Sequence, residues 1–343
     1  MNGRSPRIAI DAMGGDHAPE EIVAGAVLAA ADGLGHMVLV GDRARVAPLL
    51  AHHGAAGVEV EVVHAPAAVA MDATPSQALR NADETSLGIA VNLVRDGRAD
   101  AVVSAGNSGA FLAIALVRLR TIAGVGRPAI AVVYPAKYGP VVVLDSGANV
   151  DCRPEWLVQF GVMGAAYARA VLGIERPKVG IISVGEERVK GNAQTIEAAN
   201  LLERSPLNFI GNVEGRDVLF NHADVVVTDG FVGNVMLKLS EGAGALIGDI
   251  VTGELKGGNL LIKLGALLAR PALQRVRERV SYESYGGAPL LGLRGNCIVA
   301  HGRAGRQAIR SAIRAAAAEV REDVVGRIGE LVEPLDVGAA KEA

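Results

Sequence analysis

The sequence contains few cysteines, few aromatic residues and no long apolar run. Its 343 residues include two cysteines, Cys152 and Cys297, and only 3% are Phe, Trp or Tyr. This pair matches neither a disulfide framework nor a metal-ligand spacing, so we expect buried, reduced thiols in a cytoplasmic protein. No uncharged run reaches the length of about 18 residues that a transmembrane helix needs, and the N-terminal residues lack a hydrophobic signal region. These absences predict a chain that does not span a membrane.

Motifs of several enzyme classes are also absent. We find no G-x-S-x-G elbow of a serine hydrolase, no G-x-x-x-x-G-K-[ST] phosphate loop and no H-x-x-x-H metal pair. The 34 Lys and Arg residues nearly balance the 37 Asp and Glu residues, for a formal charge of -3, which argues against nucleic acid as a partner. We therefore expect no metal, no cofactor and no nucleic acid to be bound.

Short aliphatic runs and glycine dominate what is present. Half of the residues are hydrophobic, and many of the 43 glycines follow apolar runs. These runs alternate with amphipathic segments, which predicts an α/β fold with a doubly wound, mostly parallel sheet. The predicted strands are Arg7–Asp11, Met37–Val40, Val58–His64, Ala101–Ser104, Ala129–Val133, Val141–Leu144, Lys178–Ser183, Asn208–Asn212 and Val225–Thr228.

Helix patterns fill the segments between the strands. Glu84–Arg95 has the helical period, and Pro154–Val171 reads as a long helix with a proline in its first turn. The large side chains of the second helix recur at helical spacing, which indicates a core stripe: Trp156, Phe160, Met163 and Tyr167. Because no repeat or clear linker interrupts the pattern, we expect residues 1–336 to form a single domain and residues 337–343 to be a disordered tail.

One segment differs from this alternation. Glu254–Arg279 carries leucines on one face, interleaved with lysines and arginines. Such a segment can lie on an anionic membrane surface or pack against a partner subunit, and the pattern alone favours the partner subunit. We expect a protruding helical arm at about residues 249–280.

Polar, glycine-rich loops follow the predicted strands, where ligands bind in open α/β sheets. The first, IDAMGGDHAP, contains Asp11, Gly14, Gly15, Asp16 and His17. Glycines before a helix expose main-chain N–H groups that suit a phosphate or another anion. The two carboxylates would repel a bare anion, so we assign them to orientation or loop structure.

The next two loops are SAGNSGA, with Asn107, Ser108 and Gly109, and LDSGANVDC, with Asp145 and Asn149. The first could cradle a phosphate oxygen or simply cap a helix. The two acids of the second could suggest a divalent cation, but no third hard ligand lies nearby in the sequence.

Two further loops contain the most distinctive polar residues. SVGEERVKGN places Lys190 and Asn192 at the start of a helix, where the helix dipole disfavours a cation and a functional role becomes plausible. The second, TDGFVGNV, contains Asp229, Gly230, Gly233 and Asn234. Asn234 could donate a hydrogen bond to an oxyanion, or it could only cap a helix.

Together with NVEGRD and YGGAPLLG, these loops resemble the PlsX family of phosphate acyltransferases in order and approximate spacing, from about Arg7 to Leu331. The resemblance implies a fold similar to isopropylmalate dehydrogenase and phosphotransacetylase. It also implies a homodimer that transfers a long-chain acyl group from acyl carrier protein to inorganic phosphate, giving acyl phosphate for phospholipid synthesis. Peripheral contact with the inner face of the cell membrane, through the leucine-rich arm, is implied as well.

The resemblance also implies roles for individual residues. Lys190 would hold phosphate and stabilise the developing charge, while Asn234 would orient the thioester carbonyl. The main-chain amides around Gly14, Gly15 and Ser108 would line the site, and the other polar loop residues named above would bind substrate. Two alternatives remain at this point: a nicotinamide-linked decarboxylating dehydrogenase of related fold, and a non-catalytic membrane scaffold that binds acyl carrier protein.

Overall fold

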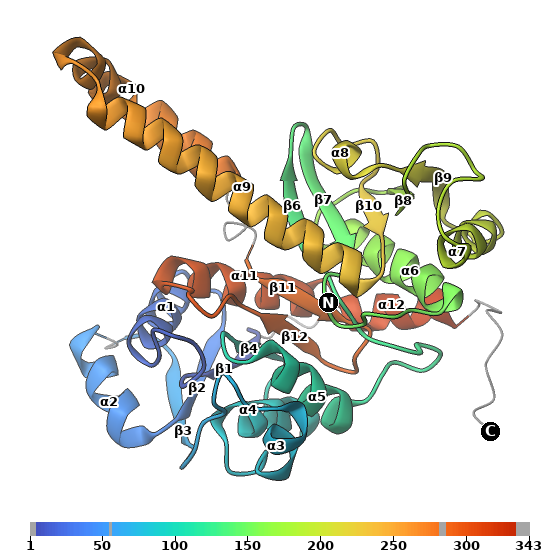
Figure 1. Cartoon of the computed structure of the whole chain (residues 1–343). Helices are drawn as coiled ribbons and strands as arrows, with labels where there is room; N and C mark the ends of the chain where they lie inside the picture. The colour runs from blue at the N-terminus through green and yellow to red at the C-terminus, as the bar shows by residue number, and fades with distance from the viewer. Residues whose placement is uncertain (1–4, 55–56, 281–285, 334–343) are drawn as a thin grey trace.

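Two β-sheets, each covered by helices, form the body of the protein in the computed structural model, and a long helical arm projects from it (Figure 1). The structure describes residues 5–54, 57–280 and 286–333. The predicted tail at residues 337–343 lies outside these ranges.

The first sheet has seven strands. Five of them are parallel, four from the N-terminal region and one, β12, from near the C-terminus. Strand β11 is antiparallel to both of its neighbours. In spatial order the strands are β3 (Val60–His64), β2 (His36–Gly41), β1 (Arg7–Asp11), β4 (Ala101–Ser104), β12 (Asn296–Val299), β11 (Ala288–Leu291) and β5 (Ala129–Ile130).

Successive residues of the central strands face opposite helical layers. In β1, Ile8 and Ile10 pack on one side and Ala9 on the other, and none of the three is exposed. A strand buried on both faces has no alternation of polar residues, which is why this run is uninterrupted. One face is covered by α1 (Glu20–Ala31), α2 (Arg43–His52) and α11 (Arg306–Arg321), and the other by α3 (Pro75–Arg80), α4 (Ser86–Arg95) and α5 (Ser108–Leu119).

The second sheet has five strands, of which only the edge strand β6 is antiparallel. In spatial order they are β6 (Val132–Ala136), β7 (Gly139–Leu144), β10 (Val225–Val227), β8 (Lys178–Ile182) and β9 (Asn208–Val213). Its main core lies under α6 (Pro154–Ala170), α7 (Ala193–Glu203) and α12 (Val324–Val332). The opposite face packs beside the short helix α8 (Gly215–Val218) and the beginning of α9 (Gly230–Gly257).

The α/β class and the mostly parallel pairing are confirmed, but the strand predicted at Ala129–Val133 was wrong as a single element. The chain leaves the first sheet after Ile130 and enters the second at Val132. Ala131 lies between them, fully buried, with its N–H bonded to the carbonyl oxygen of Pro289 at 2.8 Å. A continuous apolar run indicates that its residues are buried, but it does not indicate that they belong to one strand. Here two different sheets bury parts of the same run.

The predicted core stripe of the long helix is confirmed in α6. Phe160 and Met163 are completely buried and Tyr167 is 2% exposed, while Trp156 is partly buried against the same cluster. Pro154 occupies the first turn, where a missing N–H costs no intrahelical bond.

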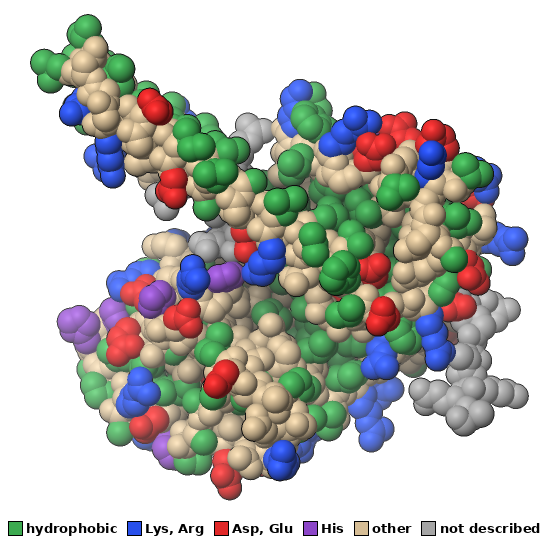
Figure 2. Space-filling model, in the orientation of Figure 1, with side chains coloured by type: hydrophobic (Ala, Val, Ile, Leu, Met, Phe, Trp, Pro, Cys, Tyr) green, Lys and Arg blue, Asp and Glu red, His purple; other side chains and the backbone are tan. Residues whose placement is uncertain are grey.

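The arm is an antiparallel pair of helices, α9 and α10 (Leu260–Val280), which extends well beyond both sheets (Figure 1). It begins earlier than predicted, because α9 continues without a break from Gly230 at the end of β10. Figure 2 shows apolar side chains over much of its visible face. The large apolar residues exposed on it are Phe231, Val235, Leu239, Leu246, Ile247, Ile250, Val251, Leu260, Leu261, Ile262, Leu264, Leu267, Leu268, Leu273 and Val276. Within the described ranges, every helix is too short or too polar to cross a membrane.

Candidate active site

Asp11 lies at the carboxyl end of β1 and is held by the loop that follows β4. Its Oδ2 accepts a hydrogen bond of 2.7 Å from Oγ of Ser104, which accepts one of 3.0 Å from the N–H of Gly106. Only 2% of Asp11 is exposed. Burial raises the pKa of its carboxyl, while hydrogen bonds from Ser86 and Ser104 act in the opposite direction. Asp11 therefore joins two of the predicted loops and has almost no surface of its own.

The glycine pair after Asp11 lets three loops meet closely. A Cβ atom on Gly14 would lie 2.9 Å from the main-chain nitrogen of Gly106. Gly15 has a φ of +108°, and its Cβ would lie 3.1 Å from the carbonyl oxygen of Gly302. That oxygen accepts a hydrogen bond of 2.8 Å from the N–H of Asp16. The loop after β12 thus belongs to this region, although a lone glycine beside a histidine was too weak a signal to predict it.

Asn107 both caps α5 and holds a neighbouring loop. Its Oδ1 accepts a hydrogen bond of 2.9 Å from the N–H of Ala110, and its Nδ2 donates to the carbonyl oxygens of Met71 and Ala73, both at 2.9 Å. The capping interpretation is thus confirmed for Asn107. The exposed predicted residues of these loops are Asp16, His17, Ser108 and Gly109.

In the second sheet, the carboxylate of Asp145 organises the loop that follows β7. Oδ1 accepts hydrogen bonds from the N–H groups of Ile130 (3.0 Å), Gly147 (3.2 Å) and Ala148 (3.0 Å). Oδ2 accepts from the N–H of Asn149 (2.6 Å) and from its Nδ2 (2.9 Å). Asp145 is completely buried, and this burial raises the pKa of its carboxyl against the effect of the hydrogen bonds. Its carboxylate is occupied by its own loop.

The first turn of α9 packs directly on this loop. The N–H of Gly230 donates to the carbonyl oxygen of Asn149 at 2.7 Å. A Cβ atom on Gly233 would lie only 1.9 Å from the carbonyl oxygen of Asp145, so this contact requires glycine. On the next residue, the exposed side chain of Asn234 lies beside Gly147, whose Cβ would be 3.6 Å from that of Asn234.

Lys190 lies in the loop after β8, and β8 is the neighbour of β10. The side-chain Nδ2 of Asn212 donates to the carbonyl oxygens of Glu187 (2.8 Å) and Lys190 (3.3 Å), which holds the loop from β9. The side chain of Lys190 packs over Gly185, is exposed, and forms no ion pair with any described carboxylate.

Asn192 and Asp229 begin the helices that leave this edge of the sheet. Oδ1 of Asn192 accepts a hydrogen bond of 2.8 Å from the N–H of Thr195 in α7. Oδ1 of Asp229 accepts one of 2.8 Å from the N–H of Val232 in α9. Both residues are therefore helix caps.

The two sheets are connected at Ile130, where the chain passes from the first sheet to the second. Ile130 ends β5, which runs in the same direction as β1, β4 and β12, so it lies at the edge where Asp11 lies. At this point Ile130 bonds to Asp145 and its carbonyl oxygen accepts from the N–H of Ser146 at 2.9 Å. β4 and β5 are three strand spacings apart, or about 14 Å. The crossover at Ile130 thus links the strand-end edge of the first sheet to the loop of Asp145 in the second sheet.

The predicted loops offer main-chain amides, the ammonium group of Lys190 and the hydroxyl group of Ser108. The thiol of Cys152 lies beside the loop of β7, but burial raises its pKa to about 12, so it is a poor nucleophile. In the part of the chain that the structure covers, no three His, Cys, Asp or Glu side chains are grouped so as to hold a metal ion.

This fold is shared with solved phosphotransacetylases. The phosphotransacetylase from Streptococcus pyogenes superposes with a TM-score of 0.64 and 16% identity, over 93% of this chain and 95% of that one. A 4-hydroxythreonine-4-phosphate dehydrogenase from Burkholderia phymatum superposes with a TM-score of 0.51 and 16% identity, over 92% and 98%. The predicted similarity to the phosphotransacetylase and dehydrogenase group is confirmed at the level of the fold.

Sequence comparison identifies the family within this class. A family model described as "Fatty acid synthesis protein" matches residues 6–327. The phosphate acyltransferase of Syntrophotalea carbinolica is 49% identical over 94% of this chain and 92% of that protein. The chain therefore belongs to the PlsX family of phosphate acyltransferases, and it is an acyltransferase. The dehydrogenase and scaffold alternatives are set aside.

Proposed function

We propose that the protein transfers a long-chain fatty acyl group from acyl-acyl carrier protein to inorganic phosphate, giving acyl phosphate for phospholipid synthesis. One observation supports this most directly: the loop after β4 leads into the exposed N-terminal turn of α5, and Ser104 joins it to Asp11 at the end of β1. The side chain of Asn107 accepts a hydrogen bond from the N–H of Ala110. The N–H groups of Ser108 and Gly109, in the same exposed turn, can therefore donate to an anion.

The reaction needs alignment more than acid or base catalysis. A phosphate oxygen attacks the thioester carbonyl carbon, the carbonyl oxygen takes up negative charge, and the C–S bond then breaks to release the pantetheine thiolate. The leaving thiol has a pKa of about 8.5, and phosphate is already nucleophilic near neutral pH, so neither step requires a strong acid or base. The raised pKa of Cys152 supports direct transfer without an acyl-enzyme.

In this proposal, Lys190 and Asn234 stabilise the negative charge of the phosphate and of the thioester carbonyl oxygen. Lys190 is a cation without a carboxylate partner in the described chain, so its charge is available to phosphate. Asn234 is exposed beside Gly147, where its Nδ2 can donate to the carbonyl oxygen as charge grows there. The first turn of α7, which follows the loop of Lys190, contacts the loop after β7, because Nε2 of Gln194 donates to the carbonyl oxygen of Cys152 at 2.8 Å.

We also propose that the protein works as a homodimer, with its arm in peripheral contact with the inner face of the cell membrane. The exposed leucines of α10, led by Leu260 at 83%, Leu261 at 77% and Leu268 at 76%, would enter the headgroup region. Exposed arginines farther along the helix, Arg270 and Arg275, would attract anionic lipid or the acidic acyl carrier protein.

The direct test mixes purified protein with palmitoyl-acyl carrier protein and phosphate, and measures acyl phosphate and free carrier protein. We expect both products in equal amounts and only when phosphate is present. Release of free fatty acid without phosphate, or transfer that requires a nicotinamide cofactor, would contradict the proposal.

A further inference from the structure

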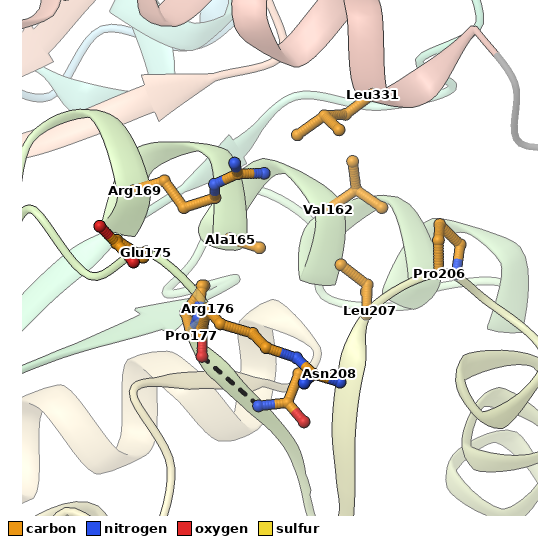
Figure 3. Close-up of a pocket in the computed structure, with 10 residues that line it drawn as sticks. All are labelled: Val162, Ala165, Arg169, Glu175, Arg176, Pro177, Pro206, Leu207, Asn208 and Leu331. Carbon is orange, nitrogen blue, oxygen red and sulfur yellow. Dashed lines mark hydrogen bonds between the residues drawn. The ribbon is translucent and has the colours of Figure 1, made fainter.

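A cavity lies at the N-terminal ends of β8 and β9, opposite to the strand ends that carry the candidate active site. It is lined by Pro177, the residue before β8, and by Asn208, the first residue of β9, whereas the loop with Lys190 follows the other end of β8. Its cavity volume is about 130 Å³, and it opens to solvent. Its lining residues, drawn in Figure 3, are Val162, Ala165, Arg169, Glu175, Arg176, Pro177, Pro206, Leu207, Asn208 and Leu331.

The cavity combines an apolar wall with two arginines. Val162 and Ala165 of α6, together with Leu207 and Leu331, form the apolar part. Val162 and Ala165 belong to the main core of the second sheet, and Leu207 and Leu331 pack against it. This wall is therefore a fixed part of the fold, and an apolar group that covered it would be removed from water.

Arg169 and Arg176 reach the cavity from different elements, the end of α6 and the segment before β8 (Figure 3). Neither guanidinium forms an ion pair with a carboxylate of the described chain. Glu175 also lines the cavity, but Figure 3 shows it at the edge away from Leu207. Two guanidinium groups beside one apolar wall favour a carboxylate or phosphate joined to an aliphatic body.

Asn208 adds a directional group beside Arg176 (Figure 3). Its Nδ2 donates to the carbonyl oxygen of Arg176 at 3.4 Å, which fixes the amide relative to that arginine (Figure 3). We propose that this cavity binds an aliphatic anion, a short alkyl chain that ends in a carboxylate or a phosphate, as a second site separate from the candidate active site. The head group would lie between Arg169 and Arg176, and the chain would lie against Leu207 and Leu331.

The site is tested by calorimetric titration of the full-length protein with octanoate and with octyl phosphate, below their micelle concentrations. Octyl glucoside serves as the neutral probe and inorganic phosphate as the head group alone. We expect saturable binding of at least one octyl anion, and the tighter of the two identifies the head group. Equal binding of octyl glucoside would overturn the charge requirement.

Variants locate the binding. The Arg169→Gln, Arg176→Gln double variant should bind the octyl anion at least tenfold more weakly, and each single variant at least threefold. Arg45→Gln, which removes an exposed arginine of α2 without a partner in the described chain, should bind as the wild type does. The single variants keep the test decisive if the double variant misfolds. Unchanged affinity in all of them would overturn the proposal.

Binding in the active site is distinguished by two further measurements. Lys190→Ala should retain the octyl-anion affinity, because the cavity is at the opposite end of β8. A photoreactive diazirine analogue of octanoate should label peptides that contain residues 162–177 or 206–208. Labelling confined to the loops at residues 104–110 and 183–192 would assign the ligand to the active site and overturn this inference, while leaving the proposed acyl transfer untouched.

Discussion

The carboxylate of Asp145 accepts a hydrogen bond of 3.0 Å from the main-chain N–H of Ile130. Ile130 is the last residue of β5, after which the chain enters the second sheet. The same carboxylate holds the loop of Gly147, on which Asn234 rests. One buried side chain thus connects the crossover between the sheets to the proposed carbonyl-binding residue. Asp145 acts through its loop, since it has no exposed surface.

Replacing Asp145→Asn tests this positioning role. The amide keeps the shape of the side chain but offers one acceptor where five donor contacts are made, so several donors become unpaired. We expect a loss of stability of about 1–3 kcal/mol in urea unfolding and a fall in kcat. A soluble, folded variant with wild-type kcat would show that the loop does not need this carboxylate.

Lys190→Ala should lower kcat/KM for phosphate by about a hundredfold, which corresponds to about 3 kcal/mol of lost charge stabilisation. The melting temperature should stay unchanged, because the side chain is exposed and unpaired in the described structure. Lys178→Ala, an exposed lysine at the other end of β8, is the matched control and should retain activity. A loss below threefold for Lys190→Ala would remove this residue from the mechanism.

Asn234→Ala should act mainly on kcat. If Nδ2 stabilises the charge that grows on the carbonyl oxygen, kcat falls by about a hundredfold while KM for phosphate changes little. Asn200→Ala, on the exposed side of α7, controls for the loss of a surface asparagine. A rise in KM with unchanged kcat would indicate ground-state binding instead.

Glu319 predicts a pH dependence of stability. Its side chain is 2% exposed, Oε1 has no hydrogen-bond partner in the described structure, and burial raises the pKa of its carboxyl to about 8. The folded state therefore keeps a proton that the unfolded chain releases near pH 4.5. Stability should fall as pH rises between these values, by about 1.4 kcal/mol per pH unit from this group.

The test compares the free energy of unfolding of wild type and Glu319→Gln from pH 5 to 8. The variant carries no ionisable group at this position, so its curve should lose that slope. Parallel curves for the two proteins would show that Glu319 titrates normally.

The arm can be tested separately from catalysis. Leu260→Asp with Leu264→Asp should reduce flotation with anionic vesicles at least tenfold, because two charges enter an apolar face. Turnover of soluble acyl-acyl carrier protein should be retained. Val117→Asp, an exposed apolar residue of α5, is the control. Unchanged flotation would exclude the arm as the lipid contact, and a sizing column would show whether the same change separates a dimer.

Much of the candidate site could be predicted because its signals lie in short segments of the sequence. Apolar runs that end in glycine and polar residues mark strand ends, and the cap considered at Asn107 is confirmed. The cap considered at Asn234 is wrong, because α9 begins at Gly230 and Asp229 caps it. The strands β11 and β12 and the loop with Gly302 were missed, because they are short and their partners are distant in the sequence. β12 pairs with β4 from almost two hundred residues away, and β11 pairs with β12 and with β5.

By itself, the sequence determined the alternation of strands and helices, the order of the polar loops and the family, since each of these depends on residues close together in the chain. Only the tertiary structure decided that Ala129–Val133 divides between two sheets and that Asp11 and Asp145 are buried. Asp11 is bonded to Ser104 across 93 positions of the chain, and Asp145 is bonded to Ile130 at the crossover between the sheets as well as to its own loop. Local patterns of hydrophobicity do not contain that information.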